Sequence, residues 1–221
     1  MILRGVQFGE YHTADDWDLI MNQKTVSPPV PKTTYVSVPG RDGDLDLTTA
    51  LSGLVNYQNR KAEYIFLLTN GSQLDREELI AEIIGVLNGQ SLEIIDTEDY
   101  PDYYMVGRLT VTEVTNNKAY GAVKIEANCD PWRYATDPTV KSQTVATSDG
   151  TVNVSLTNGG YRTVTPTITV TGSITLTYGA TSQSMSAGTY TFPGFMLSPG
   201  STTVTVSGNG TITFTYQEAI F

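Results

Sequence analysis

The stretch TPTITVTGSITLTYG, from Thr165 to Gly179, places an apolar residue at almost every second position. Ile168 and Val170 alternate with threonine before Gly172, and the apolar positions after it are Ile174, Leu176 and Tyr178. Successive side chains of an extended chain point to opposite faces, so this period predicts strands with one buried face and one threonine-lined face. The stretch therefore predicts β-structure for the region around it.

The same alternation continues on both sides of this stretch. It appears in TVNVSL (residues 151–156), AGTYTFPGF (187–195) and TTVTVSGNGTITFTY (202–216). Within the last segment, SGNG (207–210) predicts a compact hairpin turn between two strands. Short, evenly spaced strands predict a small β-sandwich. A mucin-like Ser/Thr stalk is the alternative, and the strict alternation argues against it.

Charge divides the chain into two regions. Residues 1–134 hold 11 of the 13 Lys and Arg residues and 20 of the 23 Asp and Glu residues. This shift, together with two prolines in CDPWRYATDPT (129–139), predicts a boundary between a domain of residues 1–134 and a domain of residues 135–221. The net charge of −10 argues against nucleic-acid recognition and against an anionic membrane partner.

The sequence also bears on where the chain works. No apolar run is long enough to predict membrane insertion. The N-terminal stretch lacks the apolar core of a signal peptide, so we expect synthesis in a cytoplasm, and retention there unless something else carries the protein out.

The first region mixes strands with one helix. LDREELIAEIIGVLNG (74–89) is helical: Asp75 and Glu78 predict a capping box, and Gly89 is placed to end the helix. The expected apolar face is Leu79, Ile80, Ile83, Ile84 and Leu87. Strands are expected at residues 33–38, 45–51, 63–68, 91–96, 103–114 and 120–127. The fold class is therefore mainly β with one α-helix: an antiparallel β-sandwich or split-barrel-like domain, then a small β-sandwich.

The segment PGRDGDLDLT (39–48) carries three alternating aspartates. Asp42, Asp44 and Asp46 match the first three ligand positions of an EF-hand loop. Leu47 and Gly53 stand where that loop needs a glycine and a bidentate glutamate. Catalytic carboxylates need one acid held in an apolar pocket, and no pattern here indicates one. We predict a tight turn at residues 40–43 with polar residues alternating outward.

Residue types required for common enzyme chemistry are scarce. His12 is the single histidine and Cys129 the single cysteine, which excludes a disulfide within the chain and argues against triads and Cys/His metal clusters. No phosphate-binding glycine loop or nucleophile-elbow motif is present. We expect no catalytic residue, metal or cofactor, and we expect the chain not to be an enzyme. His12 is expected to cap a turn.

Aromatic residues are the remaining candidates for a binding role. The candidates are Tyr103, Tyr104, Trp132 and Tyr134. Such side chains could fill a groove between the domains, anchor a protein interface or stack on sugars.

Several segments, taken in order, resemble one family. They are FGEYHTADDWDLI, PPVPKTTYVSVPGRDGDLDLT, YQNRKAEYIF, the helix with LNGQ, DYYMVGRLTV, ANCDPWRY and, with less specificity, FMLSPGSTTVTVSGNGTITFTY. This ordered set resembles the distal tail protein (Dit) family of long-tailed, siphovirus-like bacteriophages and prophages of Gram-positive hosts. The turn residues in the second segment become candidates for a structural or subunit-interface role: Pro39, Gly40, Arg41, Asp42 and Gly43.

The resemblance implies a structural tail-tip protein. The family's first domain forms a ring, usually a hexamer, that joins the tail tube to the tail-associated lysin, fibre or receptor-binding apparatus. Its second domain is a galectin-like β-sandwich. The expected location is the distal end of the tail in the virion, after assembly in the host cytoplasm. The alternative is a carbohydrate-binding β-sandwich module for host-surface adhesion, although a second domain without a large insertion makes saccharide binding less expected.

Overall fold

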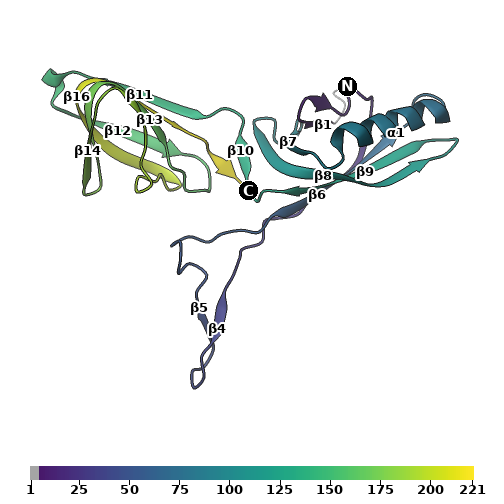
Figure 1. The fold of residues 1–221 in the computed structure, drawn as a ribbon, viewed down its shortest axis with the longest axis horizontal. Coiled ribbons are helices and arrows are strands. Elements are labelled where there is room, and N and C mark those ends of the chain that lie inside the picture. The colour runs from purple at the N-terminus through teal and green to yellow at the C-terminus, as the bar shows by residue number, and fades with distance from the viewer. Residues whose placement is uncertain (1–4) are drawn as a thin grey trace. The chain divides into compact units, whose positions relative to one another are not determined.

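The computed structural model describes residues 5–221, and they divide into two compact units. The first unit is Met1–Arg133 together with Phe221, and the second is Tyr134–Ile220. The fold is mainly β, and the described residues contain one α-helix (Figure 1), which confirms the expected fold class. No helix among the described residues is long and apolar enough to cross a membrane.

The first unit is built on one antiparallel sheet. Its strands follow the order β2-β1-β7-β8-β9-β6-β3, and β10 pairs with β8. On β6 and β9 every second residue is buried, as expected for strands with one face against a core. The strands are β1 (Val6–Phe8), β2 (Tyr11–His12), β3 (Ile20–Val26), β6 (Arg60–Leu68), β7 (Ser91–Asp96), β8 (Tyr103–Asn116) and β9 (Gly121–Cys129), and β10 (Arg133–Ala135) begins at the last residue before the unit boundary.

Helix α1 (Gln73–Leu87) begins one turn earlier than its predicted capping box. The Ser72 hydroxyl accepts a hydrogen bond from the Asp75 backbone N–H at 3.2 Å, and the Asp75 carboxylate accepts one from the Ser72 N–H at 2.8 Å. The box is therefore Ser72 with Asp75, because Asp75 itself already lies within the first helical turn. The helix ends at Leu87, two residues before Gly89.

The buried face of α1 includes a cation that the apolar pattern does not reveal. Ile80, Ile83 and Leu87 lie in the core as predicted, whereas Ile84 is exposed. Arg76 is as buried as these residues, and it donates hydrogen bonds to the carbonyls of Gly71 and Asn117, both at 2.7 Å, and to Asn116 Oδ1 at 3.3 Å. The hydrogen bonds to Asn116 and Asn117 connect the start of the helix to the end of β8 and the turn that follows it.

The second unit is a sheet of six strands organised by one long strand. β16 pairs with β13 on one side and with both β11 and β12 on the other. The 3-10 helix η1 (Thr147–Asp149) lies between β11 and β12, and β17 (Ala219–Ile220) pairs with β10. The strands of this sheet are β11 (Thr139–Val145), β12 (Thr151–Asn158), β13 (Thr167–Tyr178), β14 (Thr181–Met185), β15 (Gly188–Thr191) and β16 (Gly200–Tyr216).

The prediction of a hairpin turn at SGNG was wrong. β16 runs without interruption through these residues, and Gly208 and Gly210 lie opposite Ile174 and Gly172 of β13. Both glycines of β16 have positive φ, 119° and 147°. A Cβ at Gly210 would lie 1.7 Å from the Thr171 carbonyl oxygen. The glycines therefore allow two paired strands to pass very close to each other at one point, instead of reversing the chain.

Hydroxyl groups cover the outer face of this sheet. Cross-strand pairs hydrogen-bond to each other, with oxygen–oxygen distances of 2.8 Å for Ser142–Thr213, Ser155–Ser201 and Thr177–Ser182. The opposite face packs into a core of aliphatic and aromatic side chains. The predicted separation of a threonine face from an apolar face is therefore confirmed.

We expect Gly210→Ala to lower the free energy of unfolding of the second unit by about 2 to 4 kcal/mol, because alanine adds strain at positive φ and a clash with β13. Calorimetric unfolding of the full chain measures this change. Gly194→Ala is the control, since a Cβ there meets no atom within 4 Å, and its effect should stay within about 0.5 kcal/mol. Equal effects of the two substitutions would contradict the role assigned to Gly210.

Candidate functional site

The segment between β3 and β6, residues 27–59, forms an extended ribbon that we call the arm. At its root, backbone N–H groups of Ser27, Lys32 and Gln58 donate to carbonyls across the ribbon at 2.8 to 2.9 Å. Further out, β4 (Tyr35–Ser37) pairs with β5 (Asp44–Asp46) (Figure 1). The arm therefore contains the predicted turn.

The turn of the arm depends on two glycines. Gly40 and Gly43 have φ values of 81° and 72°, in the region that favours glycine. The Arg41 N–H donates to the Val38 carbonyl at 3.2 Å. Pro39 and Asp42 lie exposed in the same turn. The structure thus places all five turn residues singled out from the sequence at the tip of the arm, and their role in an interface stays a prediction.

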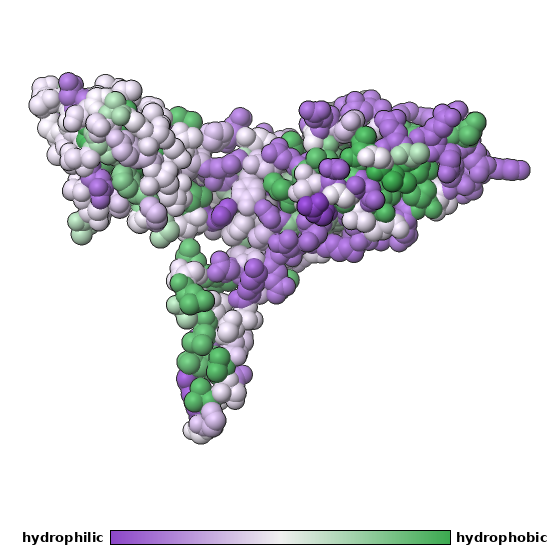
Figure 2. Space-filling view, viewed as in Figure 1, coloured by the Kyte–Doolittle hydropathy of each residue, from purple (hydrophilic) through white to green (hydrophobic). Residues whose placement is uncertain are grey.

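The arm has one apolar face and one polar face. Val36 lies opposite Leu45, while Ser37 lies opposite Asp44, so the alternation sorts the two chemistries onto opposite sides. Figure 2 shows hydrophobic residues gathered along the arm. We define the apolar face of the arm as Val36, Val38, Leu45 and Leu47, and the polar face as Tyr35, Ser37, Asp44 and Asp46.

The apolar face is not covered by the rest of the described chain. Val36, Val38 and Leu47 are 41%, 37% and 38% exposed. Two strands alone enclose no core, and such a hairpin is at best marginally stable in water. A contiguous exposed apolar surface of this kind marks an interaction site. The arm is therefore the strongest candidate for a functional surface.

Asp46 of the arm is not suited to act as a catalytic acid. Hydrogen bonds from the Thr48 side chain and backbone N–H lower the pKa of Asp46, which is the opposite of what a catalytic acid needs. Among residues 5–221, no group of three or more His, Cys, Asp and Glu side chains is placed to hold a metal ion.

One of the predicted aromatic residues belongs to a cluster at the root of the arm. The Trp132 ring stacks on Phe221 with 4.4 Å between centroids, and Tyr57 meets both rings edge-on at 5.4 and 5.0 Å. Tyr57 also bridges to Pro31 across the arm. Sequence reasoning missed Tyr57 and Phe221, because residues so far apart in the chain show no shared pattern.

The other predicted aromatics lie elsewhere. Tyr103 and Tyr104 are half-buried on β8, where Tyr104 is opposite Ile95. Tyr134 belongs to the second unit, where its hydroxyl accepts a hydrogen bond from Arg162 Nη1 at 3.4 Å. That these residues fill a groove between the domains or form an interface stays a prediction.

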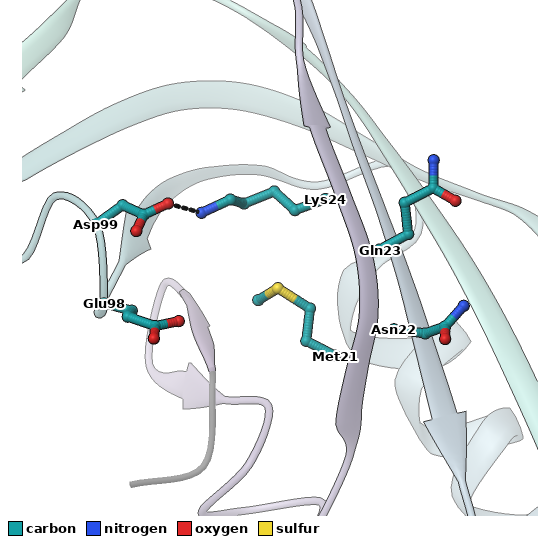
Figure 3. Close-up of a pocket in the computed structure, with 6 residues that line it drawn as sticks. All are labelled: Met21, Asn22, Gln23, Lys24, Glu98 and Asp99. Atoms are coloured by element: carbon teal, nitrogen blue, oxygen red, sulfur yellow. Dashed lines mark hydrogen bonds and ion pairs between the residues drawn. The ribbon is translucent and has the colours of Figure 1, made fainter.

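A polar recess of about 350 Å³ lies beside β3. Lys24 and Met21 point from β3 toward Glu98 and Asp99, whereas Asn22 and Gln23 point to the other side of the strand (Figure 3). Lys24 Nζ forms ion pairs with the carboxylates of Asp96 and Asp99. Burial acts to lower the pKa of Lys24, but hydrogen bonds and charge from Asp96 and Asp99 outweigh it and raise that pKa. These ion pairs connect β3 to the end of β7 and the turn after it.

His12 has a structural role, as expected. Its Nδ1 lies 3.2 Å from the Asp15 backbone N–H, which donates to it, and its Nε2 lies 3.3 Å from Thr97 Oγ1. The ring covers Gly5, where a Cβ would come within 2.4 Å of the imidazole. The imidazole is therefore engaged in closing the turn after β2.

Comparison with solved structures shows the same fold in a phage protein. The chain aligns with the crystal structure of the SPP1 Dit protein, described as a paradigm of the hub adsorption apparatus in phages that infect Gram-positive bacteria. The TM-score is 0.71, and the alignment covers 99% of this chain and 100% of that chain. Sequence identity is 15%, so this likeness establishes the fold. No family model and no curated protein matches the chain.

We expect Lys24→Met to lower the free energy of unfolding by about 1 to 3 kcal/mol, because it leaves the buried Asp96 carboxylate without its cation. Denaturant unfolding measures the change. Lys61→Met is the control, because Lys61 pairs with Glu63 and Glu126 on an exposed surface, where the loss should be below about 1 kcal/mol. An equal loss of stability in both variants would contradict the stabilising role of the Lys24–Asp96 ion pair.

Proposed function

We propose that this chain is a structural hub protein of a phage tail tip and a member of the Dit family. The observation that carries the proposal is the arm, whose apolar face is exposed in a chain that has the fold of SPP1 Dit over its whole length. The sequence resemblance supports the same conclusion from ordered segments of the first unit. The protein then works by binding other proteins and not by catalysis.

The proposed assembly is a ring of identical subunits, hexameric as the family resemblance implies. The apolar face of the arm would bind a different surface of the next subunit, which makes the contact head-to-tail. Contacts of this type close into rings when the rotation between subunits allows it. Burial of the arm would also supply the core that two strands lack. The turn residues Pro39 to Gly43 would then lie at or beside a subunit interface.

The proposed partners differ on the two sides of the ring. One side would bind the tail tube protein, and the other the tail-associated lysin, fibre or receptor-binding apparatus. The second unit would display its hydroxyl-covered sheet as a scaffold. The protein would reside at the distal end of the tail in the virion, after assembly in the host cytoplasm.

The structure gives less support to the carbohydrate-binding alternative. In the second unit, Tyr178, Tyr190, Phe192 and Phe195 pack in or against the core. Tyr161, which is 64% exposed, is the one largely exposed aromatic side chain among the described residues of this unit. Stacking on a sugar polymer usually calls for a broader aromatic surface.

The oligomeric state of variants in the arm tests the proposal. We expect the triple variant Val36→Ser, Val38→Ser and Leu47→Ser to dissociate the ring, because each substitution removes about 1 kcal/mol of apolar burial at every interface. Light scattering coupled to size exclusion, at several protein concentrations, measures the mass. Folding should be unaffected, since all three side chains are exposed in the single chain.

The matched control changes the polar face of the same arm. Ser37→Ala with Asp44→Asn should leave the assembly intact. A wild-type chain that stays monomeric at every concentration, both alone and with its tail tube protein, would argue against the hub. A ring that survives the triple apolar substitution would instead reject only the arm as its contact.

A further inference from the structure

Two arginines of the first unit are buried. Arg60 begins β6 and is 3% exposed, and Arg133 begins β10 and is 8% exposed. Arg60 Nε and Nη2 form no hydrogen bond, and neither does the hydroxyl of the fully buried Tyr64. Among residues 5–221, no carboxylate forms an ion pair with either arginine.

Arg76 shows what a buried arginine of this unit needs. It is also 3% exposed, and it donates to three acceptors around the start of α1. A guanidinium carries five N–H donors and keeps its proton, so a buried one without acceptors costs several kcal/mol. Arg60 bears that cost, because two of its nitrogens have no acceptor.

Arg60 also lies near a second positive charge. Burial, and then the charge of Arg133, lower the pKa of Arg60 to about 10. The other groups that act on it are Cys129, Tyr64 and Tyr100, which are neutral at ordinary pH. The buried Asp96 carboxylate acts on Tyr64, but it is paired with Lys24, so the two unpartnered nitrogens of Arg60 lie near a second arginine and have no carboxylate partner of their own.

We propose that Arg60, Arg133, Tyr64 and Tyr100 form a binding site for one compact oxyanion, a carboxylate or a phosphate group. Planar guanidinium groups suit both ligands, since parallel N–H bonds match two oxygens of either group. The Arg133 guanidinium lies over the Tyr100 ring, 4.1 Å from its centroid. Tyr100 is the most exposed of the four at 36%, and it lies in the turn between β7 and β8. The Tyr100 ring therefore covers the proposed site on its outer side, and the oxyanion enters when this ring is displaced.

The oxyanion has two possible sources, free phosphate or the carboxylate of a partner protein's side chain. Both satisfy the same donors, so the site does not depend on the proposed tail function. Arg60 Nε and Nη2 are buried in this conformation, so binding involves movement of the Tyr100 turn.

Calorimetric titration of the full chain with inorganic phosphate and, separately, with acetate tests the site, in chloride buffers matched for total ion concentration. We expect saturable binding of at least one anion. Arg60→Gln and Arg133→Gln should each weaken it about tenfold or more, the usual effect of losing a charge-assisted hydrogen bond. Lys141→Gln removes one exposed charge from the second unit and should leave binding unchanged.

The pattern of binding identifies the source. Binding of phosphate alone indicates a free phosphate or phosphoryl ligand, and binding of acetate indicates a partner's carboxylate. Arg60→Met keeps the shape of the site without the charge. In chloride it should unfold no more easily than the wild type, and it should lose anion binding. The absence of saturable binding to either anion, or unchanged binding by Arg60→Met, would overturn the proposal.

Discussion

Side chains of an extended strand alternate between its two faces, and each sheet of this protein is organised by that constraint. In the second unit, the alternation separates an aliphatic core from a surface of paired hydroxyls. In the first unit, it places Lys61, Glu63 and Glu126 together on the outer face, where Lys61 pairs with Glu63 on its own strand and with Glu126 across on β9. In the arm, it separates apolar from polar residues in the same way. The arm differs because two strands have no interior to receive the apolar side chains, which therefore stay exposed.

The fold class and most strands could be predicted from this alternation, but the path of the chain through SGNG could not. A glycine with positive φ fits a turn and a sharply bent strand equally well. The useful signal was the spacing: Val204, Val206, Ile212 and Phe214 all fall on even positions, as one uninterrupted strand requires. The capping box was misplaced because two overlapping patterns fit it. Ser72 and Asp75 also have the spacing of a capping box in the sequence, and the backbone of the first turn shows that this pair, and not Asp75 with Glu78, forms it.

The candidate site was predicted in part. Glycine spacing located the turn of the arm, and the alternating valines and leucines beside it were visible in the sequence. Whether another segment covers those side chains is a tertiary question that a local pattern does not answer. The same limit applies to Arg60, since nothing in its neighbourhood in the sequence indicates a buried arginine without an acceptor. The contact between Trp132 and Phe221 likewise joins residues that are distant in the chain.

The long strand β16 has a consequence for the order in which the protein folds. β11, β12 and β13 all precede β16 in the chain, and each takes β16 as a neighbour. Thr139, for example, pairs with Tyr216, so synthesis must pass through almost the whole second unit before that pair can form. Pairings between such distant residues carry a large loop-closure cost and form slowly. In the first unit, β6 and β9 are both synthesised, and can pair with each other, before the second unit is complete. On the ribosome, the sheet that carries the arm therefore acquires its structure first, and the hydroxyl-covered sheet remains open until β16 arrives.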